Sequence, residues 1–285
     1  MLHANKMTTL KFLSASVLML LVFSCGSQSR GMINDSVVNK NGLTIQDRFI
    51  VPDGFVRIDA DSTSFAFYLR SLPLKPDGEK VKHFDGREKS SDGVYCAVVD
   101  LPIGVKNLHQ CADAVIRLRA EYLWQQKKCS AIHFNFTSGF RADYSKWMSG
   151  QRISVEGNNC RWVPRREASN TYDDLWSYLE TVFMYAGTLS LEKELTAVDW
   201  GGMRPGDVLI QGGSPGHAVI VVDMIVNETT GEKRFLLAQS YMPAQEIQIL
   251  INPSNSEISP WYSLECNDDI RTPEWNFKKA DLKRF

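Results

Sequence analysis

A long hairpin in the last third of the chain is the feature that most limits the fold. Residues 217–226 and 233–241 are largely apolar, and a polar loop that contains Thr230-Gly231 separates them. Two such runs joined by a short glycine-containing loop predict two antiparallel strands that pair with each other. The first run is rich in Val and Ile, as expected for a buried strand. The fold must therefore place an antiparallel sheet in its core.

Two stretches have the apolar period of an amphipathic helix. In the first, from about residue 107 to 127, Val115, Leu118 and Tyr122 lie on one face, and the second covers residues 171–186. Helices among short strands predict an α+β fold in which an antiparallel sheet packs against the helices. With 44% hydrophobic content over 285 residues, the chain can bury a core of that kind. Further strands are predicted at residues 93–101, 131–136, 208–210 and 245–251 and around Trp275 and Phe277.

The first 25 residues have the pattern of an export signal. Lys6 and Lys11 precede an apolar run, Phe12–Phe23, that is shorter than the roughly 20 residues a membrane-spanning helix needs. The run ends in Val22–Gly26, which resembles the lipobox of bacterial lipoproteins, so Cys25 is expected to be lipidated; ordinary signal cleavage is the alternative. The sequence therefore predicts a signal peptide at 1–25, a flexible polar spacer at 26–46 and a single α+β domain at 47–285.

The net charge and the cysteine content limit which ligands and which disulfides the chain is expected to have. The formal net charge of −1 gives no basis for binding nucleic acid. Once Cys25 is assigned to the anchor, an odd number of cysteines remains, which leaves one thiol unpaired in an oxidising compartment unless all are reduced and buried. No pair has the close spacing of a zinc site, and no metal or organic cofactor is expected. The remaining cysteines are Cys96, Cys111, Cys129, Cys160 and Cys266.

Cys111 and His217 are the candidates for chemistry. Cys111 lies near the start of the first predicted helix, where the helix dipole favours an anion, and His217 opens the first strand of the hairpin. A helix N-terminus and a nearby imidazole both favour the thiolate form of a cysteine, so the two residues predict a nucleophile and its base. The alternatives are a buried structural cysteine and a histidine that bonds a backbone carbonyl.

Such a site needs a third polar group that accepts the other N–H of the imidazole. Gln239 is the first candidate. A regular hairpin centred near residues 229–230 would place Gln239 opposite Ile220, about three residues or 10 Å from His217, so the strands must curl to bring the two together. The alternatives for this role are Ser240, Tyr241 and Gln245.

Other side chains are candidates for oxyanion and substrate binding. The backbone N–H of Cys111 is the first candidate oxyanion donor, and the side chain of Gln110 or His109 is the second. The stretch 141–152 mixes aromatic and guanidinium groups, which could line a peptide or glycan cleft or form a packed surface loop. The predicted substrate-binding residues are Gln110, Arg141, Trp147 and Arg152.

Residues 205–223 contain Pro205-Gly206-Asp207, a strand, a glycine-rich link, Gly216-His217 and an apolar strand. This pattern resembles the histidine half of NlpC-type and CHAP-type peptidoglycan hydrolases, which are papain-like cysteine enzymes. The resemblance implies a papain-like fold with Cys111 as the nucleophile. The separation of 106 residues between Cys111 and His217 is long, which implies an insertion between the nucleophile helix and the histidine strand. Gln110 also stands where those families have an aspartate.

Four further segments are spread over most of the chain after the signal peptide: residues 111–122, 136–140, 187–191 and 237–245. They are similar to a bacterial lipoprotein family, the domain of unknown function 4846. That resemblance implies one coherent domain and supplies no established activity.

Together these features predict an exported, lipid-anchored cysteine amidase or peptidase of the cell envelope. It would act on an amide bond of a peptide or glycopeptide, such as a peptidoglycan stem peptide, and contact a membrane that faces the periplasm or the cell exterior through its N-terminal lipid. The rival hypothesis is a non-catalytic envelope lipoprotein that keeps a papain-like fold as a binding module.

Overall fold

The computed structural model describes residues 1, 33–90, 93–266 and 269–285. The predicted signal peptide after Met1, the predicted lipidation site Cys25 and the first part of the predicted spacer lie outside these ranges. The described chain has an α+β fold built on a mostly antiparallel sheet, as the sequence predicts. Within the described ranges, no helix combines the length and the apolar character that a bilayer span requires.

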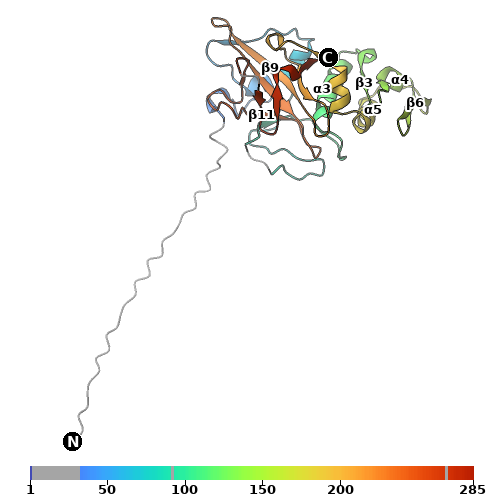
Figure 1. The fold of residues 1–285 in the computed structure, drawn as a ribbon, viewed down its shortest axis with the longest axis horizontal. Helices are drawn as coiled ribbons and strands as arrows, with labels where there is room; N and C mark the ends of the chain where they lie inside the picture. Colours follow the sequence, from blue (N-terminus) through green and yellow to red (C-terminus); the bar gives the residue numbers. More distant parts are fainter. Residues whose placement is uncertain (2–32, 91–92, 267–268) are drawn as a thin grey trace.

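The main sheet has nine strands in the described residues, in the order β2-β11-β10-β9-β8-β15-β7, with β1 paired to β9 and β12 paired to β10. These strands are β1 (Phe55–Arg57), β2 (Tyr95–Val98), β7 (Thr196–Ala197), β8 (Val208–Gln211), β9 (His217–Asn227), β10 (Lys233–Gln239), β11 (Gln248–Leu250), β12 (Tyr262–Ser263) and β15 (Leu282–Arg284). The predicted hairpin is confirmed as β9 and β10, which lie at the centre of the sheet (Figure 1).

Six α-helices and three small hairpins accompany this sheet in the described residues. The helices are α1 (Ile45–Arg48), α2 (Phe65–Arg70), α3 (Cys111–Gln125), α4 (Tyr144–Met148), α5 (Tyr172–Tyr185) and α6 (Thr188–Glu194). The hairpins are β3 (His133–Asn135) with β4 (Arg141–Asp143), β5 (Gln151–Glu156) with β6 (Asn159–Pro164), and β13 (Asp269–Arg271) with β14 (Asn276–Lys278).

The alternation of side chains along β9 divides the core into two parts. Ala218, Ile220 and Val222 face the helices and share one apolar cluster with Leu118 of α3. Their neighbours on the strand, Val219 among them, belong to a second cluster on the other face of the sheet. Because successive side chains of a strand point to opposite faces, β9 is buried on both sides. Such burial explains why the sequence of β9 is almost continuously apolar.

A β-bulge sets the register between β9 and β10. Near the loop the register is regular, with Leu236 opposite Asp223, but the next pairs are Leu237 opposite Val221 and Ala238 opposite Ile220. This shift moves Gln239 from the position opposite Ile220, expected from a regular hairpin, to the position beside Val219. A shift of one residue changes the face of the sheet that a side chain occupies.

The bulge has a direct consequence for the predicted site. In a regular hairpin, His217 and Gln239 would be an odd number of positions apart and would point to opposite faces of the sheet. With the bulge, His217 is two positions from Val219, the residue beside Gln239, so both polar side chains lie on the same face. Diagonal neighbours of this kind are within reach of long side chains.

Helix α3 begins later than the sequence pattern predicts. Gln110 is its N-cap, and the Asp113 carboxylate accepts the backbone N–H of Gln110 at 3.0 Å. Asn107, which was predicted near the helix start, instead accepts the backbone N–H of Ala244 at 2.8 Å. The correction places Cys111 at the first residue of the helix, where backbone N–H groups lack intrahelical partners.

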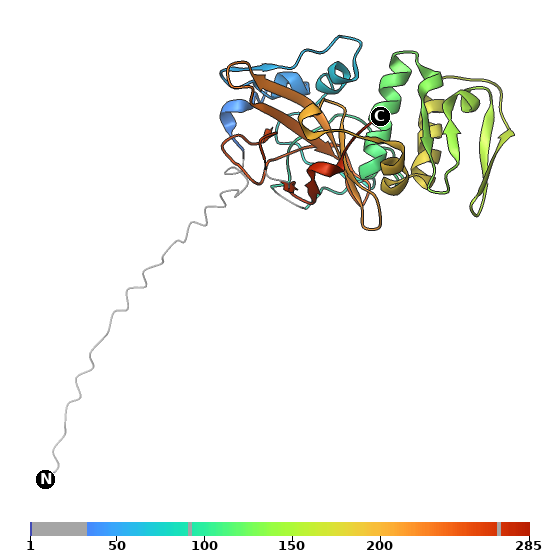
Figure 2. The ribbon, with the colours of Figure 1, turned by 45° about the horizontal axis from the view of Figure 1, so that its top comes forward.

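Much of the chain between α3 and β8 forms a separate layer. This layer contains β3 to β6, α4 and α5, and Figure 2 shows α3 between this yellow-green part and the orange strands of the sheet. Helix α6 contacts β8 directly, and β7 belongs to the main sheet. The β5–β6 hairpin was not predicted, although Ile153, Val155 and Trp162 contribute apolar contacts to the core. Their alternation with polar residues was the signal available in the sequence.

Part of the predicted spacer is folded. Val37 is buried and Ile45 is fully buried, and both belong to the helix-side core. The backbone of Val38 also bridges that of Phe49. The domain therefore begins before residue 47, because isolated apolar residues among the polar ones of this segment pack against the core.

Candidate active site

Cys111 lies beside the start of β9, the strand that His217 opens. The thiol of Cys111 lies beside the backbone N–H of Ala218, the residue that follows His217, and close to Tyr241. The ring of Tyr241 packs against the ring of His217, with 4.9 Å between their centroids. The cysteines in the described ranges, Cys111 included, are all free. Two residues 106 positions apart in the sequence therefore share Tyr241 as a neighbour, and the Cys111 thiol is not in a disulfide.

The histidine is held by the predicted third residue. Nε2 of His217 lies 2.8 Å from Oε1 of Gln239, and both side chains are 1% exposed. The amide nitrogen of Gln239 donates to Oε2 of Glu274 at 2.6 Å. Since a carboxylate accepts and does not donate, Glu274 fixes the orientation of the Gln239 amide.

This orientation selects the tautomer of His217. The amide oxygen of Gln239 can only accept, so Nε2 of His217 must carry the proton. The other ring nitrogen, Nδ1, then has a free lone pair, which a general base requires. The structure therefore leaves the imidazole ready to accept a proton at Nδ1.

Lys89 completes the chain of polar contacts behind the histidine. Its ammonium group donates to Oε2 of Glu274 at 2.6 Å and lies 5.5 Å from the centre of the Tyr241 ring. Burial lowers the pKa of Lys89, and the Glu274 carboxylate opposes that shift. Neither Lys89 nor Glu274 was predicted, because both lie in loops without a spacing that links them to Gln239.

Aromatic rings enclose the imidazole. Trp275 and Phe277 lie 5.5 Å and 6.0 Å from the His217 ring centroid, in addition to Tyr241. The indole N–H of Trp275 donates to Oε1 of Gln211, the residue paired with His217 on β8. These rings keep the His217–Gln239 hydrogen bond away from water and so strengthen it.

Gly216 is required by the close packing just before His217. A Cβ atom at this position would lie 2.4 Å from Oγ1 of Thr188 and under 3 Å from two backbone oxygens. No other residue type fits without moving the backbone. The glycine-rich link thus brings the start of β9 against the start of α6.

Burial sets the protonation states of the pair. It raises the pKa of Cys111 to about 11, with the Asp113 carboxylate as the second cause, although the nearby backbone N–H groups favour the thiolate. Burial also lowers the pKa of His217 to about 4, opposed by its bond to Gln239. The sequence predicts that the helix terminus and the imidazole favour the thiolate. In the structure the loss of solvation outweighs the helix terminus, so both the thiol and the imidazole are neutral.

A pocket of about 600 Å³ opens beside Cys111. Its walls come from the start of α3, the end of α5, the start of α6, the glycine-rich link and Met242. The lining residues are Asn107, Leu108, Gln110, Cys111, Ala112, Asp113, Thr137, Phe183, Met184, Ala186, Gly187, Thr188, Leu189, Gly213, Ser214, Pro215, Gly216 and Met242. A pocket of this size can hold a short peptide segment next to the thiol.

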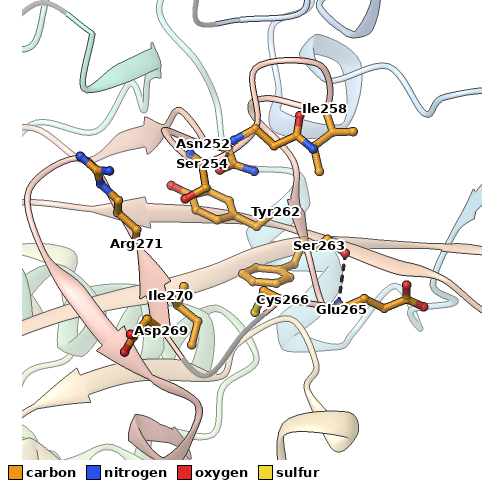
Figure 3. A pocket seen from close by; sticks show the side chains of 12 residues that line it. Asn252, Ser254, Ile258, Tyr262, Ser263, Glu265, Cys266, Asp269, Ile270 and Arg271 are labelled. Carbon is orange, nitrogen blue, oxygen red and sulfur yellow. Dashed lines mark hydrogen bonds between the residues drawn. The ribbon is translucent and has the colours of Figure 1, made fainter.

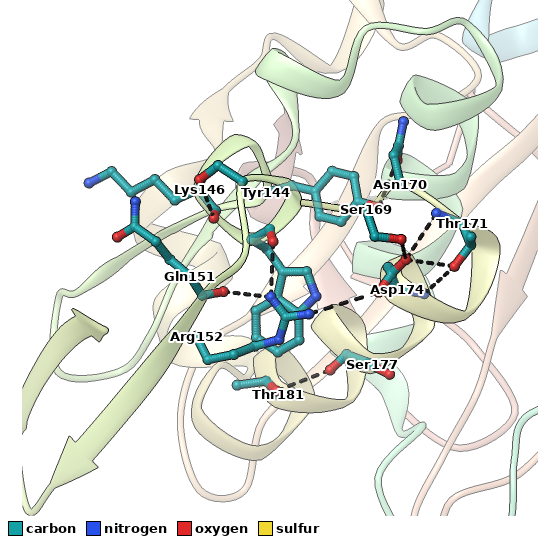
Figure 4. Close-up of polar contacts among 12 residues, drawn as sticks. Tyr144, Lys146, Gln151, Arg152, Ser169, Asn170, Thr171, Asp174, Ser177 and Thr181 are labelled. Atoms are coloured by element: carbon teal, nitrogen blue, oxygen red, sulfur yellow. Dashed lines mark hydrogen bonds and ion pairs between the residues drawn. The ribbon is translucent and has the colours of Figure 1, made fainter. Parts of the chain in front are cut away.

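Only one of the predicted substrate-binding residues, Gln110, lines this pocket. Trp147 is buried and packs against Tyr178, and the guanidinium of Arg152 lies 4.1 Å from the Trp147 ring centre. Figure 4 shows Arg152 directed toward Asp174 at the start of α5. Arg141 is exposed and pairs with Asp143 of its own strand. The structure therefore places these three residues in the layer beyond α3 and not in the pocket.

Ser240 and His109, the alternatives for the third catalytic residue and for the oxyanion donor, contact other groups. The Ser240 hydroxyl group lies within hydrogen-bond distance of the backbone oxygens of His109 and Gln245. His109 is 1% exposed, its Nδ1 lies 3.2 Å from the Gln245 carbonyl, and burial lowers its pKa to about 3. It is not among the residues that line the pocket, so of the two predicted side-chain oxyanion donors only Gln110 reaches it.

A second cavity of about 290 Å³ is shown in Figure 3. Phe235 and Tyr262 line it, and both belong to the apolar cluster on the face of the sheet away from the helices. Tyr262, Ile270 and Cys266 line it, together with polar residues of the loop from Asn252 to Ile258. None of the predicted site residues borders it. In the part of the chain that the structure describes, no cluster of three or more His, Cys, Asp or Glu side chains could hold a metal ion.

Comparison with known proteins identifies the family. No curated protein and no solved structure is significantly similar to the chain. A family model described as domain of unknown function (4846) matches residues 45–284, which includes every element from α1 to the end of the main sheet. The chain therefore belongs to this family of unknown function.

Proposed function

We propose that the protein is a papain-like cysteine hydrolase or acyl transferase that acts on an amide bond. Cys111 is the nucleophile, His217 is its base and Gln239 orients the ring. The observation that carries the proposal is the hydrogen bond between Nε2 of His217 and Oε1 of Gln239, because Glu274 fixes its direction. That direction leaves the lone pair of Nδ1 free to take a proton from Cys111, whose thiol lies beside the backbone N–H of Ala218.

The reaction begins from a neutral pair. As Sγ of Cys111 attacks the carbonyl carbon, its proton passes to Nδ1 of His217 and the carbonyl oxygen becomes an oxyanion. The backbone N–H of Cys111 is the first donor to this oxyanion, with the Gln110 side chain at the pocket wall as the second. Nδ1 then protonates the leaving amine, and the acyl group remains on sulfur as a thioester. Water or an acceptor amine releases it by the reverse proton movements.

The substrate class follows from the sequence-based expectations. An export signal with a lipidated Cys25 would place the domain at the surface of a cell-envelope membrane, where the amide bonds of peptidoglycan stem peptides are accessible. The insertion between α3 and β8 supplies α5 and α6, which form two walls of the pocket. A short envelope peptide or glycopeptide is therefore the substrate class that we propose.

A specific observation favours the rival function, a binding module without catalysis. Cys111 is 7% exposed, and its pKa is raised to about 11 by burial. Reactive cysteines usually have a lowered pKa, whereas structural buried cysteines are inert. In this alternative, the pocket holds a peptide and the thiol is part of its wall.

Iodoacetamide labelling of the folded protein separates the two functions. If His217 activates the thiol, Cys111 should react faster at pH 7 than Cys96, Cys129, Cys160 or Cys266, although it is more buried than all four. Peptide mass spectrometry at timed intervals gives the rate at each site. Cys160 is the built-in reference, because it is more accessible than Cys111. If Cys111 reacts more slowly than Cys160, the binding module is favoured.

A further inference from the structure

We propose that Asp113 determines substrate specificity by binding a primary ammonium group next to the bond that Cys111 attacks. This proposal rests on the proposed function for the identity of the attacked bond. The amine-binding site itself depends only on the pocket and on Asp113. The expected substrate is a peptide that carries a free amine close to the scissile carbonyl.

The first observation is an unpaired oxygen. Asp113 is 5% exposed, and its Oδ2 accepts the backbone N–H of Gln110 at 3.0 Å. Its Oδ1 is buried and has no hydrogen-bond partner, although Asp113 lines the pocket. A buried carboxylate oxygen without a donor is energetically costly. A ligand that brings a donor into the pocket would remove that cost.

The second observation is the composition of the pocket. Among its lining residues Asp113 has the one carboxyl group, no Lys, Arg or His is present, and apolar side chains form most of the wall. Three of these are exposed at the rim: Met184, Leu189 and Met242 are 53%, 38% and 55% exposed. A single carboxylate in apolar surroundings favours a cation, because no protein group in the pocket supplies the opposite charge.

The geometry of Asp113 favours an ammonium over a guanidinium group. A guanidinium group binds a carboxylate best through two parallel hydrogen bonds, one to each oxygen. Oδ2 of Asp113 is already engaged by Gln110, so only Oδ1 is free. A compact ammonium group needs one acceptor at this point and can direct its other N–H groups elsewhere.

The location of Asp113 places the amine near the reacting bond. Asp113 and Cys111 are two residues apart in the first turn of α3, and the carboxylate interacts electrostatically with the thiol. Burial raises the pKa of Asp113 to about 8 in the empty pocket, and a bound ammonium group would stabilise the carboxylate. Recognition of the amine therefore places a defined carbonyl of the substrate at Cys111.

Charge-varied thiol reagents test this proposal without a known substrate. At each cysteine we compare the rate of modification by cationic 2-aminoethyl methanethiosulfonate with the rate by the neutral methyl reagent, at about pH 8.5. We expect this rate ratio to be about tenfold larger at Cys111 than at Cys160. The anionic 2-sulfonatoethyl reagent should be slower than both. In Asp113→Asn, which keeps an acceptor for the Gln110 N–H, the preference for the aminoethyl reagent should fall to the ratio at Cys160. Equal preferences in the wild type and in Asp113→Asn would overturn the proposal.

A second measurement uses only the wild-type protein, so it tests the proposal even if Asp113→Asn does not fold. Butylammonium should protect Cys111 from the neutral methyl reagent, whereas butanol at the same concentration should not. Equal protection by the two compounds would also overturn the proposal. Neither experiment needs catalysis by His217. If the proposed function fails but the amine site is present, Cys111 still prefers the aminoethyl reagent while His217→Ala leaves its alkylation by iodoacetamide unchanged. Failure of the amine site is thus distinguishable from failure of the proposed function.

Discussion

Replacing His217 with alanine is expected to slow the alkylation of Cys111 by iodoacetamide at pH 7 by about a hundredfold, the lower range of general-base effects. The reason is the raised pKa of Cys111, about 11. At pH 7 a thiol with that pKa is ionised in only about one molecule in 10⁴, so rapid reaction depends on proton transfer to Nδ1.

The rate of Cys111 alkylation should depend on pH differently in the wild type and in His217→Ala. The pKa of His217 is lowered to about 4, so its neutral, proton-accepting form is present from pH 5 upward. The wild-type rate should therefore vary weakly between pH 5 and pH 8. In His217→Ala the rate should rise about tenfold per pH unit toward the pKa of the thiol, because only the thiolate reacts.

The control variant is His133→Ala, which removes a partly exposed histidine whose Nδ1 lies 3.1 Å from the Ala131 carbonyl. It should leave both the rate and the pH profile unchanged. Added imidazole should partly restore the rate in His217→Ala, since the enclosed space left by the side chain can hold it. If His217→Ala and the wild type react at the same rate and with the same pH profile, His217 is not the base.

Replacing Asp223 with asparagine is expected to reduce the free energy of unfolding by roughly 3 kcal/mol, as for other broken buried ion pairs. Asp223 is fully buried on β9 and contacts Arg57 at 2.8 Å and Arg70 at 3.2 Å. Burial raises the pKa of Asp223 in spite of the two guanidinium groups. Removal of the carboxylate would leave Arg70, itself buried, without its counter-charge.

The matched control for this prediction is Glu156→Gln, which breaks the exposed pair with Arg161 at 3.3 Å. Exposed pairs contribute about 0–1 kcal/mol, so its unfolding midpoint in urea should barely change. Asp223→Asn should lower the midpoint clearly, yet keep selective labelling of Cys111 below the transition. Equal midpoints for the two variants would contradict the assigned role of Asp223.

The sequence was sufficient for the elements whose patterns are local. The apolar runs of β9 and β10 and the period of α3 and α5 are set by burial, so their approximate bounds are visible in the sequence. The same local patterns place Cys111 at a helix start and His217 at a strand start. The choice of Gln239 also agrees with the hydrogen bond found in the structure.

The remaining features depend on tertiary contacts. The bulge between Asp223 and Val221 changes the face of Gln239, and nothing in the apolar pattern of β9 marks it. Glu274 and Lys89 come from distant loops and meet only in the folded chain. The raised pKa of Cys111 results from burial, which outweighs the local effect of the helix start. These features could not be predicted from residue types and spacing.

The central claim is that Cys111 and His217 act together as nucleophile and base, and acyl transfer from p-nitrophenyl acetate tests it most directly. The measurement is the mass of the intact protein after rapid quenching, followed by peptide mapping. The account predicts one acetyl group on Cys111 that forms and is then released in the wild type, and that forms far more slowly in His217→Ala. Acetylation spread over lysines and other cysteines, with Cys111 unmodified or unaffected by His217→Ala, would contradict it.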